Sequence, residues 1–529
     1  MAYYKDLREQ LQAIERAGKL QRIDSPINKD TELQPLVRLQ FRGLQEEQRK
    51  AFYFSNVTDS KGKCYSMPVV LGCAAGSGEI YAIGMGCPID EISARWAEAQ
   101  ANPIPPRLVR TAAACQEVVH IGDAIKREGL AMLPVPIATP GLDNAPYTSA
   151  SNWITKDPDT GIRNVGNYRG QIKANDRIGC FSASAGKGIF QHWLKCKGKG
   201  IPLHAAAVVG VSPNISYVAV TKFSGDVDEL SVAGGLAKAP VELVKCKTVD
   251  LEVPANAEIV IEGIIPTDSL EPEGPFGEFT GFMASRAVTL FMEVTAITHR
   301  RDAIYQGFVS QFPPSESSKI RQISGEQRVK RILLENGLGN VIEVAYNEST
   351  GAFALCVVQI RKRSPEDAKK IFDAIVKGVG FGKIVIVVDE DVDPRDVESV
   401  LWATSFRMQP HRDMEIRDMP AHPLDYSVAS PYEGGARGPG TVKPRSTLLC
   451  IDATTKWAYP PTSLPSKEVM EHAVEIWQNE GLPPLNLKVP WWGYPLGYWP
   501  DQDRDEAALA LASEYFQTGL KNREGRRKS

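Results

Sequence analysis

The sequence lacks long apolar runs and an excess of charge of either sign. None of its 529 residues belongs to an apolar stretch that reaches the ~18–20 residues of a membrane span. The N-terminus reads MAYYKDLREQ, which is polar and has no signal-peptide core. We therefore expect a cytoplasmic protein that makes no membrane contact. The 61 basic and 64 acidic residues nearly cancel, which argues against a nucleic-acid binder driven by net charge.

Cysteine pairs and nucleotide-binding fingerprints are also missing. Nine cysteines are scattered without a CxxC pair, which predicts reduced, mostly buried thiols and argues against a cysteine-rich zinc site. The glycine-rich stretch AAGSG at 74–78 lacks the Lys-Ser/Thr of a phosphate loop and the spacing of a dinucleotide fingerprint. A second such stretch, GVGFG at 378–382, joins a predicted helix to a strand, the reverse of a phosphate loop. We interpret both as turns.

The length and the order of the predicted elements indicate several domains. A chain of 529 residues is too long for one core, and its 43% hydrophobic and 24% charged residues are those of an ordinary globular protein. We predict a multidomain protein of the α/β (α+β) class. Its parts are an N-terminal α/β domain over 1–115, a central strand-rich domain over 116–310 and a C-terminal α/β domain over 311–529.

Apolar spacing assigns the elements of the first two parts. Residues 3–18 place Tyr4, Leu7, Leu11 and Ile14 at helical spacing, with Gly18 as the stop. In the central part, β-branched runs broken by Pro and Gly predict strands and favour a barrel or a sandwich. These runs are 204–212, 216–222, 257–265 and 288–298.

The C-terminal part alternates between helix and strand. We expect helices over 326–337 and 364–378, the latter capped by Ser364, and strands over 353–360 and 383–391. This alternation predicts a parallel or mixed sheet. Near the end, an aromatic-rich stretch precedes a helix with an apolar face that includes Ala507, Leu511 and Tyr515. That face docks either on a neighbouring subunit or on its own domain.

One loop carries an unusual set of acids. Residues 271–281 read EPEGPFGEFTG, with Glu271, Glu273 and Glu278 among three glycines and two prolines. The prolines exclude a regular helix or a central strand, and the glycines allow tight bends. Such a loop presents carboxyl groups for acid–base chemistry, although a surface turn with solvated glutamates has the same composition.

A second constellation contains residues that suit a phosphate and a divalent metal. The segment NVGNYRG (164–170) offers Asn164 as an oxygen ligand and Arg169 as a planar fork for carboxylate or phosphate. FSASAGKG (181–188) is small, hydroxyl-bearing and basic, and DVDEL (226–230) adds Glu229. Each has an ordinary surface or capping explanation when taken singly, but together they predict a phosphate, metal and acid–base site.

Several of these motifs resemble one known family over nearly the whole chain. The motifs are NVGNYR, LVKCKTVDLEVPANAEIVIEG (243–263), EGPFGEFTG and DATTKW (452–457). They closely resemble the UbiD family of reversible decarboxylases. The resemblance implies an N-terminal α/β domain, a central split β-barrel of flavin-reductase type and a C-terminal α/β domain. It also implies a terminal helix that reaches across a dimer, as homodimer or homohexamer.

The resemblance also implies a cofactor and the residues that hold it. The cofactor is prenylated FMN, supplied by a flavin prenyltransferase and held with a divalent metal, usually Mn²⁺, and often K⁺. Asn164 and Glu229 match the metal ligands. The cofactor-binding positions match Asn167, Tyr168, Arg169, Phe181, Ser182, Ala183, Gly186, Lys187 and Glu229. The sequence departs from the family in one metal ligand, a histidine that many members carry in this segment. Ala185 and Lys187 stand nearest to its place, and His192 comes a few residues later.

By the same resemblance, the substrate carbon bonds covalently to the cofactor, carbon dioxide leaves, and Glu278 returns a proton within a network with Arg169 and Glu273. The implied substrates are aromatic, heteroaromatic or α,β-unsaturated acids, or an aryl-CoA ester such as phthaloyl-CoA. The basic 434–445 segment either contacts a CoA phosphate or covers the cofactor. The alternatives are an FMN-dependent oxidoreductase, against which the missing nicotinamide fingerprint counts, and a degenerate, non-catalytic flavin-binding partner.

Overall fold

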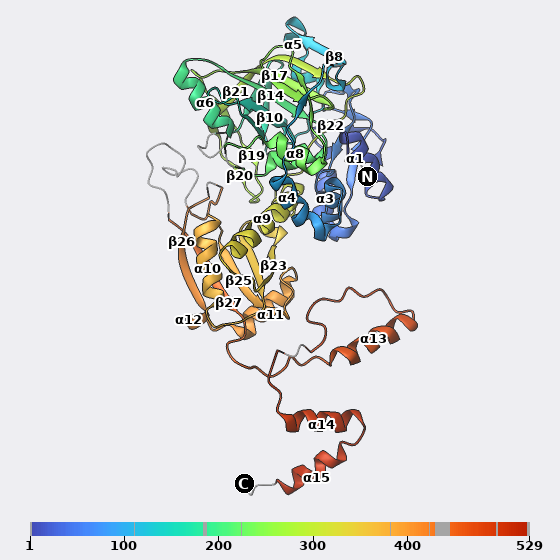
Figure 1. The fold of residues 1–529 in the computed structure, drawn as a ribbon. Coiled ribbons are helices and arrows are strands. Elements are labelled where there is room, and N and C mark those ends of the chain that lie inside the picture. The colour runs from blue at the N-terminus through green and yellow to red at the C-terminus, as the bar shows by residue number, and fades with distance from the viewer. Residues whose placement is uncertain are drawn as a thin grey trace. The chain divides into compact units, whose positions relative to one another are not determined.

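The structure is a computed structural model, and it describes residues 3–110, 112–182, 188–223, 225–380, 382–422, 424–428, 445–493 and 496–525 (Figure 1). These residues form two compact units. Unit 1 lies within Met1–Gln327, Glu348–Phe353 and His422–Pro444, and unit 2 lies within Arg328–Asn347, Ala354–Ala421 and Arg445–Ser529. The three-domain division stays a prediction. In the described part of the chain, no helix is both long and apolar enough to cross a membrane.

Unit 1 begins with a helix and a small sheet. Helix α1 (Leu7–Arg16) is capped by the side chain of Asp6 and buries Leu7, Leu11 and Ile14, which confirms the helix expected from the apolar spacing. The sheet has the strand order β1 (Leu20–Ile23), β3 (Ala51–Phe54), β6 (Val69–Leu71) and β22 (Tyr305–Gln306). Helices α2 (Leu33–Gly43), α3 (Gly78–Met85) and α4 (Ile92–Ala101) follow in this part of the chain.

A ten-stranded sheet forms the centre of unit 1. Its main path is β11 (Arg163–Asn167), β10 (Asn152–Lys156), β14 (Leu203–Val209), β17 (Ile259–Ile265), β21 (Ala287–His299), β13 (Arg177–Cys180), β12 (Gly170–Ala174) and β9 (Tyr147–Thr148). Strands β18 (Glu271–Glu273) and β8 (Val118–Ile121) also pair with β21, so this one strand pairs with four others.

Both faces of this sheet are covered at its central strands β14 and β17, which explains why these two strands are mostly apolar. Along β14, Ala206 and Val208 pack into one hydrophobic core, whereas Ala205, Ala207 and Val209 pack into another. A strand buried on both sides has no polar face, so its sequence does not alternate. The strands expected at 204–212, 257–265 and 288–298 are present as β14, β17 and β21.

One expected strand of this region is wrong. Residues 216–222 were expected to be a strand, but Pro213–Val220 forms helix α7, with Pro213 in its first turn. Seven of its eight residues are buried, so the apolar run carries no helical period that would distinguish it from a buried strand. Unit 1 also contains helices α6 (Gly188–Lys199) and α8 (Glu229–Ala237).

Unit 2 contains the expected mixed sheet. Its order is β23 (Val341–Tyr346), β24 (Leu355–Ile360), β25 (Ile384–Asp389), β27 (Ser446–Ala453) and β26 (Met414–Met419), and β24, β25 and β27 are parallel. Helices α10 (Asp367–Gly378) and α11 (Val397–Arg407) belong to this unit, while α9 (Glu316–Glu335) begins ten residues before the expected start. Ser364 is not the cap of α10: the N-cap is Glu366, and the Ser364 hydroxyl donates to Asp367 Oδ1 at 2.8 Å.

The remaining elements are short. They are the strands β2 (Ile27–Asn28), β4 (Val57–Thr58), β5 (Cys64–Tyr65), β7 (Arg107–Leu108), β15 (Glu242–Lys245), β16 (Glu252–Pro254), β19 (Phe276–Gly277) and β20 (Met283–Ala284), and the helices α5 (Asp123–Arg127) and α12 (Pro410–Asp413).

The last three helices of unit 2 are not packed. Helices α13 (Lys467–Asn479), α14 (Asp501–Leu511) and α15 (Phe516–Glu524) bury no residue, and Leu511 and Phe516 are 80% and 74% exposed. Docking of this apolar face on its own domain is therefore not seen in the described ranges. Docking on a neighbouring subunit stays a prediction. Most of the basic 434–445 segment lies outside the described residues.

Candidate functional site

The acidic loop and the second constellation meet at Arg169. Its guanidinium donates from Nε to Glu273 Oε1 at 2.9 Å and from Nη2 to Glu273 Oε2 at 2.7 Å, which is a bidentate pair. Its Nη1 also donates to Glu278 Oε1. The structure thus brings together the three residues predicted to be catalytic, although Arg169 precedes the two glutamates by more than 100 positions.

Local backbone geometry places the two glutamates. Glu273 ends β18, where it pairs with Ala287 of β21 at the sheet edge, so the prolines of this loop do not interrupt a central strand. Glu278 follows β19, and its backbone N–H donates to Phe282 O while its carbonyl accepts from Gly281 N, which closes a tight turn. Gly274 and Gly281 adopt φ of +96° and +91°, a region that other residues rarely occupy.

The two carboxylates of the network differ in access to solvent. The side chain of Glu273 is fully buried, whereas that of Glu278 is 14% exposed. Arg169 lies 3.9 Å from the ring centroid of Phe181 and 4.9 Å from that of Phe276. Burial lowers the pKa of Arg169, but the charges of Glu278 and Glu273 outweigh burial, so its pKa is raised and it stays a cation.

Two oxygen-bearing side chains predicted as metal ligands lie close together. Asn164 is on β11, and the backbone N–H of the next residue, Val165, donates to Glu229 Oε2 at 3.0 Å. A Cβ on Gly188 would stand 1.8 Å from Asn164 Oδ1, so only glycine leaves room for this amide at the start of α6. Burial raises the pKa of Glu229 to about 7, and a bound cation would favour its ionised form.

The ligand types suit the predicted metal, but the set is incomplete. Carboxylate and amide oxygens are ligands that Mn²⁺ accepts. Among the residues that the structure describes, no group of three His, Cys, Asp or Glu side chains could hold a metal ion. Asn164 and Glu229 therefore fit a metal as two ligands of a larger set, and Mn²⁺ and K⁺ stay predictions.

The other predicted cofactor residues are only partly described. Asn167 donates to Ser151 O at 3.2 Å, and burial raises the pKa of Tyr168 to about 12. Ser182 is 1% exposed, and its hydroxyl has no hydrogen-bond partner in the described structure, which leaves a polar atom available for a bound group. Ala183, Gly186 and Lys187 lie outside the described residues.

His192, the histidine nearest to the missing ligand position, is engaged elsewhere. It lies on α6 and is 7% exposed, with Nδ1 2.9 Å from Thr155 Oγ1. Its Nε2 is 3.9 Å from Asp157 Oδ2. Burial lowers the pKa of His192 to about 4, so the ring is neutral near pH 7.

Two residues near the acidic loop were missed. Asp143 accepts from Thr139 N at 2.7 Å and from Gly277 N at 3.4 Å, and burial raises its pKa to about 6. Arg321 on α9 stacks its guanidinium 3.9 Å from the ring centroid of Phe279. Asp143 stands in an ordinary turn sequence, and α9 was expected to begin only at 326, so no local pattern marked either residue.

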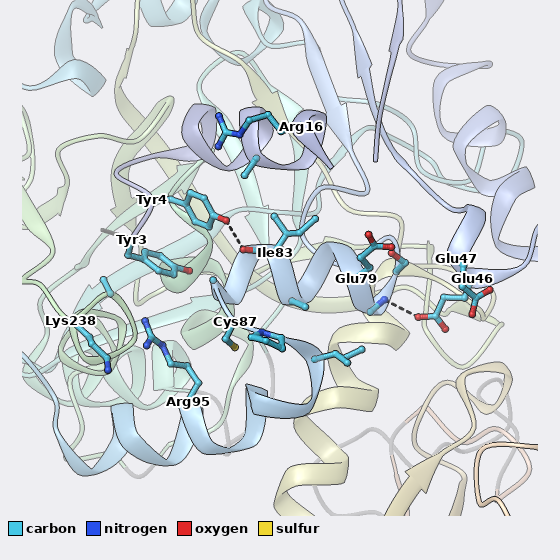
Figure 2. Close-up of a pocket in the computed structure, with 18 residues that line it drawn as sticks. Tyr3, Tyr4, Arg16, Glu46, Glu47, Glu79, Ile83, Cys87, Arg95 and Lys238 are labelled. Carbon is cyan, nitrogen blue, oxygen red and sulfur yellow. Dashed lines mark hydrogen bonds between the residues drawn. The ribbon is translucent and has the colours of Figure 1, made fainter. Parts of the chain in front are cut away.

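A cavity elsewhere in unit 1 contains none of these residues. It measures about 1070 Å³, and Figure 2 shows its lining, which includes Tyr4, whose hydroxyl donates to Ile83 O at 2.7 Å, and Glu46, which accepts from Gly78 N at 2.8 Å. Arg16, Arg95 and Lys238 also line it. None of the predicted site residues that the structure describes lines this cavity.

Two family models match the chain. Residues 107–313 match the model described as 3-octaprenyl-4-hydroxybenzoate carboxy-lyase Rift-related domain. Residues 325–439 match the model described as 3-octaprenyl-4-hydroxybenzoate carboxy-lyase C-terminal domain. Together the two models cover more than half of the 529 residues.

Known proteins support the same assignment. An uncharacterized protein of Aquifex aeolicus (strain VF5) is 35% identical over 393 residues, which are 72% of this chain and 76% of that protein. The UbiD-class enzyme HmfF from Pelotomaculum thermopropionicum, solved with FMN, has a TM-score of 0.74 and 31% identity, covering 91% of this chain and 97% of HmfF. An evolved dimeric form of HmfF, solved with prFMN, has the same TM-score and identity, and the match covers 87% of this chain and 97% of that one.

A third similar protein is named for its substrate. Vanillic acid decarboxylase of Sedimentibacter hydroxybenzoicus, in its closed form, has a TM-score of 0.73 and 29% identity, covering 90% of this chain and all of the matched chain. The fold is thus the mixed α/β multidomain fold of these enzymes. With the two family models and the 35% identical relative, these likenesses show that the chain belongs to the UbiD family of carboxy-lyases.

Proposed function

We propose that this protein is a non-oxidative, reversible decarboxylase of an aromatic or α,β-unsaturated acid, uses prenylated FMN and takes its proton from Glu278. The substrate is either the free acid or an aryl-CoA ester. Two similar proteins support the cofactor and the acid, since HmfF was solved with FMN and prFMN and the Sedimentibacter enzyme is a vanillic acid decarboxylase.

The observation that carries the proposal is the unequal environment of the two glutamates. Glu273 is fully buried and gives both oxygens to Arg169, so it fixes the orientation of the guanidinium. Glu278 shares the same arginine but keeps part of its side chain exposed. Only Glu278 therefore combines a fixed position with access to a bound substrate, which is what a general acid requires.

The cofactor fits this site by the chemistry of its donors. Asn164 and Glu229 supply oxygen ligands for a metal at its phosphate, and the Ser182 hydroxyl offers an unsatisfied polar atom. We also propose that the bound cofactor is surrounded by Asn167, Tyr168, Phe181, Ala183, Gly186 and Lys187. We propose further that the central sheet is a split barrel. When bound, prenylated FMN supplies an electrophilic centre that takes up the electron pair left on carbon.

The residues of the chain then perform three tasks. Arg169 holds Glu278 at a fixed angle through Nη1, while Glu273 holds Arg169. Phe181 and Phe276 lie against the guanidinium and exclude water from it. Glu278 then serves as the acid that delivers a proton to the substrate carbon after carbon dioxide leaves, as a positioned acid does.

The test uses protein co-expressed with a flavin prenyltransferase. Glu278→Gln should bind the cofactor, seen by absorbance and by intact mass of the released flavin, but should release no CO₂. The matched control is Glu271→Gln in the same loop, because Glu271 pairs with Lys173 at 3.1 Å and lies outside the network. Near-wild-type turnover of Glu278→Gln would refute the assignment.

The same samples separate the alternatives. Exchange of hydrogen for deuterium at the substrate carbon in D₂O requires a working acid and supports the decarboxylase. A protein that stores prenylated FMN without any exchange, over a panel of aromatic acids and their CoA esters, would favour a non-catalytic flavin-binding partner. Plain FMN in the active protein would favour the oxidoreductase.

A further inference from the structure

The cavity drawn in Figure 2 has charged side chains of opposite sign at its two ends. Its volume is about 1070 Å³, which is at the upper end of the roughly 300–1,000 Å³ of small-molecule sites. Figure 2 shows Arg95 and Lys238 at one end. The glutamates that line the cavity lie at the other end, and they are Glu46, Glu47 and Glu79. A ligand that fills this space meets cations at one end and carboxylates at the other.

Arg95 is a cation without a carboxylate at ion-pair distance. It lies on α4, is partly buried, and donates from Nη2 to Leu236 O at 2.8 Å. Its Nε is buried without a hydrogen-bond partner, and among the described residues its guanidinium forms no ion pair. Burial raises the pKa of Tyr3 and of Cys87, which also line the cavity, and the charge of Arg95 acts in the opposite direction on both. The positive charge of Arg95 therefore acts inside the cavity.

Most of the other charges are neutralised by residues that do not line the cavity. The pairs are Lys238–Glu98 at 2.8 Å, Glu79–Lys19 at 2.6 Å and Glu46–Lys319 at 2.7 Å. Arg16, on α1, is exposed and, within the described ranges, also lacks an ion pair. Arg16 and Arg95 thus leave two positive charges against the one exposed carboxylate of Glu47. The cavity has a net positive charge, which favours an anion.

Two tyrosines form an aromatic wall next to these cations. Tyr3 donates to Gly84 O at 2.5 Å and Tyr4 donates to Ile83 O at 2.7 Å, so helix α3 fixes both rings. The ring centroids are 5.2 Å apart, with the planes at 60°. Burial raises the pKa of Tyr4 and the charge of Arg16 lowers it, which places this second cation near the ring. The wall suits a flat ring whose anionic group reaches the guanidinium groups.

We propose that this cavity binds a nucleoside phosphate. The phosphate oxygens accept from the guanidinium groups of Arg95 and Arg16, whose planar forks match them. The base lies against the tyrosine wall, and the ribose hydroxyl groups donate toward Glu47. A single-ring acid would leave most of about 1070 Å³ empty, so the size favours the larger ligand. The described residues of the proposed decarboxylase site do not line this cavity, and the inference is therefore independent of that function.

The test is calorimetry on cofactor-loaded protein with four probes: AMP, ADP, adenosine and inorganic phosphate. Loading fills the flavin site with its own phosphate, so heat from a nucleotide arises elsewhere. We expect AMP and ADP to bind at least about 10-fold more tightly than adenosine or inorganic phosphate, because only the nucleotides combine the ring with the anion.

Variants then locate the binding. Arg95→Gln should weaken AMP binding at least about 10-fold, and Arg95→Lys should recover only part of the loss. Ala13→Phe adds a ring to the cavity wall from α1 without changing charge, and it should weaken AMP binding by a similar factor. The matched control is Arg22→Gln, because Arg22 pairs with Glu15 at 2.7 Å and does not line the cavity. Its Kd for AMP should equal that of wild type, and thermal unfolding without ligand checks that each variant is folded.

Three results would overturn the inference. They are the absence of heat with AMP and ADP, equal affinity of AMP and inorganic phosphate, and an unchanged Kd in both Arg95→Gln and Ala13→Phe. The release of CO₂ from aromatic acids is a separate measurement, so either proposal fails without the other. If the protein takes up no prenylated FMN, the same titrations on the purified protein still test the cavity, because the variants change only its lining.

Discussion

At Arg169, a single guanidinium holds two carboxylates that stand five positions apart in one loop. The pair with Glu273 is enclosed by protein, since Arg169 is 9% exposed and Glu273 is fully buried. Removing one member of a buried ion pair leaves the other as an uncompensated charge, and this costs more than removing both. The site is therefore coupled to the stability of the loop that carries it.

The first prediction follows from this coupling. Arg169→Ala should lose both cofactor and activity and should lower the free energy of unfolding by roughly 3–5 kcal/mol, because Glu273 stays buried without its partner. The double variant Arg169→Ala with Glu273→Gln should be more stable than Arg169→Ala alone. Urea unfolding of wild type, Arg169→Ala, Glu273→Gln and the double variant checks this, and additive losses would contradict the coupling.

Asp143 gives a second prediction, on pH dependence. Burial raises its pKa to about 6 in the folded state, above its ordinary value. An acid with a raised pKa stabilises the fold while protonated, so this contribution is present below about pH 4 and disappears as the pH rises through 6. Wild type should thus lose stability relative to Asp143→Asn between pH 4 and 6, with a constant difference above pH 7. Unfolding midpoints across this range measure it, and a parallel pH course of the two proteins would exclude Asp143 as the cause.

The sequence identified some residues of the site and missed others for a physical reason. Arg169, Glu273 and Glu278 were predicted because their loop composition and family motifs are local features, and the structure brings them together. Asp143 and Arg321 approach the loop only through tertiary packing. An aspartate in a turn and an arginine on a helix are each common, so neither stands out before the fold is known.

At the level of elements, the acidic loop depends on close packing at a glycine. Gly277 lies in β19, next to Glu278, and a Cβ there would stand 2.6 Å from Gln311 Cγ and 2.8 Å from Thr139 Oγ1. Gln311 is 4% exposed, and its Oε1 accepts from Arg38, so its side chain has little room to move. Any added side chain must shift the loop.

The third prediction uses this constraint. Gly277→Ala should lower kcat at least 10-fold by displacing Glu278, and it should cost about 1–3 kcal/mol of stability through overpacking. The control is Gly198→Ala inside α6, where a Cβ meets nothing within 4 Å, and which should stabilise the protein by about 0.5–1 kcal/mol. Steady-state kinetics and thermal unfolding compare them; full activity of Gly277→Ala would show that the loop tolerates the shift.

The prediction of helices and strands succeeded where the spacing of apolar residues fits only one of the two. Helices α1 and α10 carry a polar face, so their period is visible, and the parallel strands of unit 2 are short apolar runs between turns. It failed at α7, where nearly every residue is buried and the pattern fits either element. Full burial removes the information that distinguishes helix from strand.

For the whole molecule, the unpacked C-terminal helices provide a fourth prediction. Helices α13, α14 and α15 bury no residue, although they carry large apolar side chains. Isolated helices of this length are marginal in water, so they need a partner surface. The 529-residue protein should be an oligomer by light scattering after size exclusion, and a chain ending at residue 457 should be a monomer. An unchanged mass would show that other surfaces hold the subunits together.

Long-range pairing was beyond sequence reasoning. Strand β22 has only two residues, Tyr305 and Gln306, and it pairs in parallel with β6 through Val69 and Val70. A two-residue strand leaves no periodicity, and its partner lies more than 200 positions earlier. The pairing is therefore visible only in the folded structure.

That late strand has a consequence for how the protein is made. The small sheet of β1, β3 and β6 gains its fourth strand only when residue 306 has been synthesised. At about 5–20 residues per second, the interval after β6 is roughly 10–50 s, during which the nascent sheet keeps an open edge on the ribosome. The first hundred residues are thus exposed to wrong pairing for far longer than a hairpin takes to form. Chaperones that shield β edges should raise the yield of this protein more than its composition suggests.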